Sequence, residues 1–330
     1  VRAVLSGLVR FLLLVTISKD CVGFYLKGID TRAHLLSNIK RTGVIHRHRD
    51  FSMMQRENGN SKVVKRISHT SPLLPDSPVQ SDSALVILNR PLGSPPSQLF
   101  QKLWELSSFR ICADGGANRL FDSTVLTNLQ SKYVPDAIRG DLDSLRPDVR
   151  KYYEGLGCTV DKEIDQDRND LDKALMEAHR KKLRKVYVYG AFGGRFDQEM
   201  ASLQALYAWE SSFEQLVLYD DETCAFLLSA GVLNEISLVF YGDDSNDEFR
   251  PTDKLRIGEG PTCGLIPVGH PCDIVVTKGF QWDLDGTVPL EFGGLVSTSN
   301  RIIDKVAIVE CSRPLVFTAE IQFFSEAQRM

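Results

Sequence analysis

From residue 83 to about residue 228, short apolar segments alternate with amphipathic ones, and this alternation constrains the fold more than any other feature. Strands that alternate with helices are typical of a mostly parallel α/β sheet with helices on both faces. We expect strands at residues 84–88, 110–113, 136–138, 158–160, 186–189 and 216–219. Such sheets bind ligands at the carboxyl ends of their strands, so the loops that follow the strands are where a site is expected.

Helices are expected between these strands. Residues 97–106 and 147–156 form two of them. Two others each carry four apolar residues at intervals of three or four positions, which puts those residues on one face. They are Leu171, Ala174, Leu175 and Ala178 in one helix, and Phe196, Met200, Leu203 and Tyr207 in the other. We interpret both stripes as faces buried against the sheet.

After about residue 228 the helical pattern stops. Short β-like runs separated by Gly, Pro and Asp follow, at 236–241, 255–257, 264–268, 273–277, 295–298, 306–310 and 315–321. Turn signals at this spacing are typical of a β-sandwich. The chain is therefore predicted to contain an α/β domain at 81–228, followed by an all-β domain at 229–330.

Residues 1–80 differ from the rest of the chain. They contain an apolar run at 8–17, too short to span a bilayer, and a basic stretch without a sustained period, for which we expect no regular structure. The sequence starts at Val1, while Met53 and Met54 stand just before the globular part. Two interpretations remain open: a targeting segment, or a gene-model extension over residues 1–52. A cytoplasmic location is expected, with an organelle as the alternative.

The charge of the chain is unevenly distributed. Residues 1–70 carry 13 Lys/Arg against 4 Asp/Glu, whereas residues 71–330 carry 26 against 39. An acidic globular part argues against nucleic acid as a partner, and no segment predicts a membrane span. The seven cysteines are scattered without a Cys-x-x-Cys pair, which favours a reduced compartment and argues against zinc.

The first acidic cluster follows the strand at 136–138. Asp141 and Asp143 are two residues apart, so in an extended segment both carboxylates point to one side, where a cation would relieve their repulsion. Carboxylate oxygens of this kind usually hold Mg²⁺ together with substrate phosphates. A solvated turn is the alternative.

The second acidic cluster precedes the helix that contains Leu171. It consists of Asp165, Asp167, Asp170 and Asp172. Acids at a helix start are favoured by the helix dipole, but capping requires one or two of them rather than four. We attribute the surplus to a cation or to donors such as Arg168 and Lys173.

Two glycine-rich turns also follow strands. In the first, Asp114 precedes Gly115 and Gly116, and it either contacts a ligand or caps the next helix. In the second, Gly193 and Gly194 lead into a helix whose N-terminus, with Arg195, can bind phosphate. Neither turn has the spacing of a P-loop or of a dinucleotide fingerprint.

The all-β part carries one aromatic candidate. Trp282 stands beside polar residues and could stack on a heteroaromatic ring whose edge is bound by the side chains of 297–300. The alternative is that Trp282 fills the core of the sandwich.

Taken in order, seven short motifs resemble thiamin pyrophosphokinases, particularly the plant-like members. They are residues 113–118, 140–144, 165–170, 193–198, 263–267, 279–282 and 297–300. The resemblance covers the chain from about residue 83 to its end. It implies Mg²⁺-dependent transfer of diphosphate from ATP to thiamin, and a homodimer whose active sites lie between subunits. A non-catalytic binding module and a kinase for another heteroaromatic alcohol are the alternatives.

The resemblance also implies roles for particular residues. Metal ligands would be Asp141, Asp143 and Asp170. ATP and its phosphates would contact Asp114, Gly115, Gly116, Gln166, Gly193, Gly194 and Arg195. Thiamin would contact Trp282, Ser297, Thr298, Ser299 and Asn300. The catalytic group would be Asp197, Arg195, Asp141 and Asp143, with Asp197 as the acceptor of the hydroxyl proton.

Overall fold

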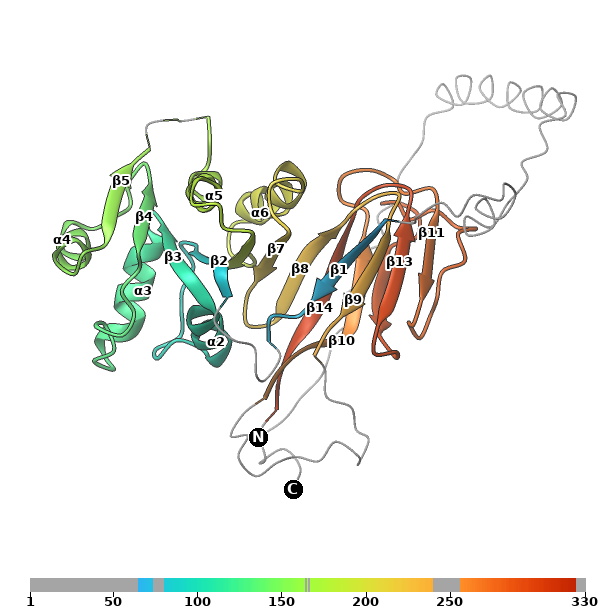
Figure 1. The fold of residues 1–330 in the computed structure, drawn as a ribbon, viewed down its shortest axis with the longest axis horizontal. Coiled ribbons are helices and arrows are strands. Elements are labelled where there is room, and N and C mark those ends of the chain that lie inside the picture. Colours follow the sequence, from blue (N-terminus) through green and yellow to red (C-terminus); the bar gives the residue numbers. More distant parts are fainter. Residues whose placement is uncertain (1–64, 74–79, 164, 166, 240–255, 325–330) are drawn as a thin grey trace, which may run out of the picture. The chain divides into compact units, whose positions relative to one another are not determined.

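The computed structural model describes residues 65–73, 80–163, 165, 167–239 and 256–324, and its main element is a ten-stranded sheet (Figure 1). The strand order is β12-β10-β14-β8-β7-β6-β2-β3-β4-β5. The strands are β2 (Gln80–Ile87), β3 (Ser107–Ala113), β4 (Ala137–Gly140), β5 (Thr159–Lys162), β6 (Lys185–Tyr189), β7 (Gln215–Tyr219), β8 (Thr223–Leu228), β10 (Arg256–Ile266), β12 (Ser297–Arg301) and β14 (Leu315–Phe324).

The six strands from β7 to β5 are parallel, as the sequence predicts. From β2 the chain proceeds through β3, β4 and β5 on one side, then returns to form β6 and β7 on the other. The strand order therefore reverses between β2 and β6. A reversal of this kind opens a crevice at the carboxyl ends of the two strands, because the loops after them run to opposite faces of the sheet.

Five helices in the described residues cover the two faces of this parallel part. Their bounds are α2 (Gln98–Leu106), α3 (Gly116–Val125), α4 (Pro147–Gly155), α5 (Asp170–Arg180) and α6 (Phe196–Ala208). Side chains of α2, α3 and α4 share a core with Leu85 and Ile87 of β2, whereas α5 and α6 pack with Ala84 and Val86. Because strand side chains alternate, β2 is buried on both faces. None of these helices is long and apolar enough to cross a membrane.

The buried face of α6 agrees only in part with the stripe that the sequence predicts. Phe196 is 70% exposed and Met200 is also exposed, while Ser202, Ala205 and Leu206 are buried. The other two residues of the predicted stripe, Leu203 and Tyr207, are half-buried and pack against the core. The stripe is therefore only partly buried, and its first two residues lie outside the core. The stripe of α5 is buried as predicted.

A second sheet of four strands has the order β1-β9-β13-β11. Its strands are β1 (Arg66–Thr70), β9 (Leu233–Ser237), β13 (Ala307–Cys311) and β11 (Val275–Lys278). Ile236 and Val309 of this sheet share a core with Phe226 and Phe317 of the ten-stranded sheet, which stack at 4.9 Å. The α/β part is thus followed by a β-sandwich, and the predicted fold class is confirmed.

The strands differ from the prediction in two places. Strand β1 lies within residues 1–80, where no regular structure is expected, and it pairs in parallel with β9. Residues 1–64 and 74–79 lie outside the described residues. In addition, β8 pairs with β7 on one side and β14 on the other, so the sheet continues across the predicted border at residue 228.

A buried carboxyl group joins the two parts of the large sheet. Glu259 of β10 is 2% exposed, and Tyr219 of β7 donates a hydrogen bond of 2.6 Å to its Oε1. Ser71, which follows β1, also contacts this carboxyl group. Burial raises the pKa of Glu259 above its ordinary value of 4.5, because the charged form is poorly solvated inside the protein.

We expect Glu259→Gln to stabilise the protein increasingly as the pH rises above 4.5. Below that pH the carboxyl group is protonated in both the folded and the unfolded chain, so the substitution has little electrostatic effect. Above it, the unfolded group ionises while the folded one keeps its proton, and the free energy of unfolding of the unsubstituted protein falls. Urea denaturation of both proteins from pH 4 to 8 tests this, and a difference independent of pH would contradict it.

Candidate active site

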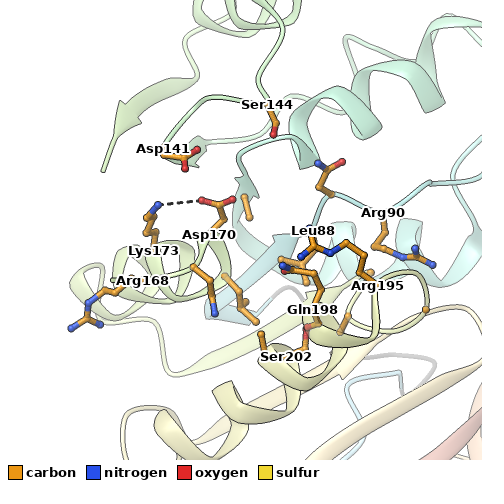
Figure 2. Close-up of a pocket in the computed structure, with 18 residues that line it drawn as sticks. Leu88, Arg90, Asp141, Ser144, Arg168, Asp170, Lys173, Arg195, Gln198 and Ser202 are labelled. Carbon is orange, nitrogen blue, oxygen red and sulfur yellow. Dashed lines mark hydrogen bonds and ion pairs between the residues drawn. The ribbon is translucent and has the colours of Figure 1, made fainter. Parts of the chain in front are cut away.

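A cavity of about 440 Å³ lies at the carboxyl ends of β2, β4 and β6 (Figure 2). It is located where the strand order reverses, the usual position for ligands in open α/β sheets. Loops after these strands and the first turns of α5 and α6 line it. The polar lining residues include Asn89, Arg90, Asp141, Ser144, Arg168, Asp170, Lys173, Arg195 and Gln198.

Three carboxylates come together beside this cavity, and we call this group the acid cluster. Asp114, Asp141 and Asp143 each offer an oxygen within 4.8 Å of the other two. The extended backbone predicted for 141–143 is wrong, because Leu142 has φ +60°. A tight turn instead brings the two acids together, with the N–H of Asp143 donating to Oδ1 of Asp141 at 3.2 Å.

Asp170, the first residue of α5, joins this group. A Cβ on Gly140 would lie 2.7 Å from Cβ of Asp114 and 3.1 Å from Oδ1 of Asp170, so a glycine is needed for the approach. Burial raises the pKa of Asp114 and of Asp170, and the charge of Asp141 raises both further. Lys173, whose side chain is 3% exposed, lies 3.4 Å from Asp170 and opposes the rise in the pKa of Asp170.

These acids fit a divalent cation. Oδ1 of Asp114 is buried and has no hydrogen-bond partner among the described residues, while Oδ2 accepts from the N–H of Ser144. A buried unpartnered carboxylate oxygen is costly, and a cation would satisfy it. The alternative role of Asp114 as a helix cap is wrong, because Gly115 occupies the N-cap position and no side chain caps α3. Hard oxygen ligands of this kind suit Mg²⁺.

The other acids before and at the start of α5 point elsewhere. Asn169 caps the helix by accepting from the N–H of Asp172 at 2.8 Å. The carboxylate of Asp172 accepts from the indole N–H of Trp209, the residue after α6, and Asp165 pairs with Arg168. Asp170 is thus the member of the second acidic cluster that the structure brings close to Asp114 and Asp141. Gln166 lies outside the described residues.

The turn after β6 has the conformation expected of a glycine-rich loop. Gly190, Gly193 and Gly194 have φ of +85°, +76° and +83°, which other residues rarely adopt. The N–H of Gly193 donates to the carboxylate of Glu199, so this N–H already binds an anionic group. In this structure the backbone donor of the turn is thus occupied by a carboxylate of the chain itself.

Arg195 and Asp197 bind each other rather than facing the cavity as free groups. Nε of Arg195 lies 3.0 Å from Oδ1 of Asp197, and both side chains are exposed. The hydrogen bond and charge of Arg195 lower the pKa of Asp197. In this arrangement Asp197 is a weaker base than an unpaired aspartate.

Gly115 and Gly116 serve close packing at the start of α3. A Cβ on Gly116 would collide with the carbonyl oxygen of Ile87, and one on Gly115 with the amide of Asn89. Asn89 also accepts a 2.9 Å hydrogen bond from Nε of Arg119. Sequence reasoning overlooked Asn89 and Arg90. The signal was their position directly after β2, at the carboxyl edge of the sheet.

Trp282 does not fill the sandwich core, since it is 58% exposed. Asn300 fixes the turn that carries it: Nδ2 donates to the carbonyl of Trp282 at 2.9 Å, and Oδ1 accepts from its N–H at 3.2 Å. Asp283 further holds the turn through the N–H groups of Gly279 and Phe280. Ser297, Thr298 and Ser299 precede Asn300 on the edge strand β12.

Within the described chain, the predicted thiamin set does not meet the acid cluster. Strand β12 is at one edge of the large sheet, and six strands separate it from β3, which leads to Asp114. The cavity beside the acids is lined by none of the residues from Trp282 to Asn300.

An α/β sheet with acids and a glycine-rich turn around a switch-point cavity is typical of an enzyme that binds a phosphorylated ligand. Two family models match the chain: the thiamin pyrophosphokinase catalytic domain over residues 100–218, and its vitamin B1 binding domain over residues 251–316. The chain belongs to the thiamin pyrophosphokinase family. This confirms the resemblance found in the sequence.

Individual relatives agree. Thiamine pyrophosphokinase 1 of Arabidopsis thaliana is 36% identical over 72% of this chain and 86% of its own length. Thiamine pyrophosphokinase 2 of the same plant is 35% identical over 78% of this chain and 93% of its own. The structure of thiamin pyrophosphokinase from Candida albicans matches with a TM-score of 0.60 and 28% identity, over 78% of this chain and 94% of that one.

Proposed function

We propose that this chain transfers the diphosphate group of ATP to the hydroxyl group of thiamin, giving thiamin diphosphate and AMP, in the presence of Mg²⁺. Family membership supports the reaction. The observation that carries the proposal is the cavity at the β2/β6 reversal, which has carboxylates on one side and a glycine-rich turn on the other.

Mg²⁺ held by Asp141, Asp143 and Asp170 would neutralise charge on the phosphates. The grouping within 4.8 Å and the unpartnered oxygen support adding Asp114 to this set. Lys173 would hold the carboxylate of Asp170 in its orientation, since the lysine is buried and donates a hydrogen bond to that carboxylate.

In the reaction, the hydroxyl oxygen of thiamin bonds to the β-phosphorus of ATP. The bond from the β-phosphorus to the oxygen shared with the α-phosphate breaks, and AMP leaves with that oxygen. The hydroxyl proton passes to a carboxylate, for which we assign Asp197. Its ion pair with Arg195 supports a coupled role: when Arg195 turns to the phosphates, the carboxylate is released and becomes more basic.

We also propose that two copies of the chain complete one site. The separation of β12 from the acid cluster supports this, because thiamin bound near Trp282 must reach ATP held elsewhere. So do the apolar residues that the sandwich leaves exposed, which are typical of an interface. They are Ile274, Trp282, Val288, Phe292, Leu295, Ile303 and Val306. Sedimentation of the purified chain as a monomer at micromolar concentration would contradict this.

Activity is tested by giving the purified chain ATP, Mg²⁺ and thiamin. We expect AMP and thiamin diphosphate in equal amounts, because the bond between the α- and β-phosphates is the one that breaks. Release of ADP would indicate transfer of a single phosphoryl group. No product, with thiamin and ATP both bound, would indicate a binding module. Faster turnover of another heteroaromatic alcohol would identify a different kinase.

A further inference from the structure

Arg90 is the feature of the cavity that no sequence motif and no role assigned above accounts for. It follows β2 directly and reaches the turn after β6, about one hundred residues further along the chain. A Cβ on Gly193 would collide with Nη2 of Arg90, and a Cβ on Gly194 with Nη1. The guanidinium group therefore lies in the space left by the two absent side chains.

The other cations that line the cavity are already paired with acids. Arg168 pairs with Asp165, Lys173 with Asp170, and Arg195 with Asp197. Among the residues that the structure describes, no carboxylate lies within 4.0 Å of the guanidinium nitrogens of Arg90, and none of its guanidinium N–H groups donates a hydrogen bond. Of the four cations that line the cavity, Arg90 is therefore the one without an ion pair to any described carboxylate.

The position of Arg90 suits an anion that extends across the cavity. Figure 2 shows Asp141, Asp170 and Lys173 on one side, and Arg90 apart from them on the other, towards Arg195. A polyphosphate that meets a cation at the acids would therefore have a second anchor at Arg90. The planar guanidinium group, which lies beside Gly193 and Gly194, offers several donors to phosphate oxygens.

We propose that Arg90 binds a phosphate group of the nucleotide, at a subsite formed with the glycine turn and distinct from the acid cluster. The inference rests on the proposed function for the identity of the nucleotide. The half-buried side chain sits where solvent screens its charge less than at the surface. The carboxylates of the cavity repel an anionic ligand, and the other lining cations are already paired with acids. Arg90 is therefore the cation that attracts the phosphate.

The test is calorimetric binding of α,β-methylene-ATP with Mg²⁺ and without thiamin. We expect Arg90→Gln to weaken this binding about tenfold or more, and Arg90→Lys to weaken it less, because a lysine keeps the charge but loses the paired donors. Adenosine, measured by competition, should bind Arg90→Gln within about twofold of the unsubstituted chain. Arg168→Gln is the matched control, a lining cation paired with an acid, and should change analogue binding less than threefold.

Equal binding of the analogue by the Arg90→Gln variant and the unsubstituted chain would overturn the inference. So would an equal loss for adenosine and for the analogue, which would mean that Arg90 only shapes the turn. Raising the salt concentration should weaken analogue binding more in the unsubstituted chain than in Arg90→Gln. If the unsubstituted chain binds the analogue through Arg90 but releases no AMP from ATP when thiamin and Mg²⁺ are present, the proposed function fails and the phosphate subsite stands.

Discussion

Asp141→Asn is expected to lower turnover by about a hundredfold or more while leaving the protein as stable as before, or more stable. Asp141 is surrounded by the other acids: it lies within 4.8 Å of Asp114 and Asp143, and its N–H donates to Asp170. Its negative charge raises the pKa of both Asp114 and Asp170, because it repels their ionised carboxylates in the folded protein. Removing that charge relieves repulsion but deprives a cation of a ligand.

The opposite signs of the two effects distinguish a metal site from a structural cluster. Turnover should be measured as AMP release, stability by urea denaturation, and cation binding by titration with Mn²⁺. Asp165→Asn is the control, because Asp165 is an exposed acid near the same cavity that pairs with Arg168. It should keep most of the activity and of the affinity for Mn²⁺. An active Asp141→Asn variant with unchanged affinity for Mn²⁺ would mean that the cation binds elsewhere.

Glu177→Met should have the largest effect on stability, lowering the free energy of unfolding by about 3–5 kcal/mol. Glu177 on α5 is buried and lies 3.1 Å from Arg139 of β4, whose side chain is 10% exposed. A guanidinium group does not lose its proton at accessible pH, so the substitution leaves a buried charge whose remaining described partner, Asp161, is mostly exposed. Arg139 immediately precedes the Gly140–Asp141 turn, so the local damage should extend to the site.

Two further variants test the explanation for Glu177. Adding Arg139→Met to Glu177→Met should restore much of the lost stability, because the double variant has no unpaired buried charge. Glu154→Met is the matched control: Glu154 pairs with Arg150 across one turn of α4, both side chains are exposed, and the change should be within about 1 kcal/mol. If Glu177→Met and Glu154→Met lower the free energy of unfolding equally, burial of the Glu177–Arg139 pair does not explain the effect.

Strand positions in the parallel sheet were predictable because each is a short apolar run bounded by turn residues. All six predicted strands overlap β2 to β7. Strand β8 is not among the predicted strands, since the apolar run at 224–228 follows β7 after a short acidic turn. The segments 255–257 and 264–268 are predicted as two strands, but the described parts of both overlap one long strand, β10 (Arg256–Ile266), with a bulge between Glu259 and Cys263. Local periodicity does not reveal a bulge, because the partner strand defines it.

The α6 helix shows a second limit of local pattern. All four apolar residues of its stripe are predicted to face the core, but Phe196 and Met200 are exposed, and only the other two pack against it. Ser202, Ala205 and Leu206 are the buried residues of this helix. Spacing places residues on a common face but does not say which face meets the sheet. That depends on how closely the neighbouring elements approach.

The sequence by itself determined the type of fold and the chemistry of the acids, because apolar periodicity and clustered carboxylates are properties of nearby residues. It also carried the motifs that identify the family. Only the tertiary structure decided which acids meet, since Asp114 and Asp141 follow two different strands, Asp170 begins a helix, and a glycine permits their close approach. It alone revealed Arg90, because the space that its guanidinium group occupies is formed by glycines about one hundred residues away. Distances between segments far apart in the chain depend on the packing of the whole sheet, and no local pattern encodes them.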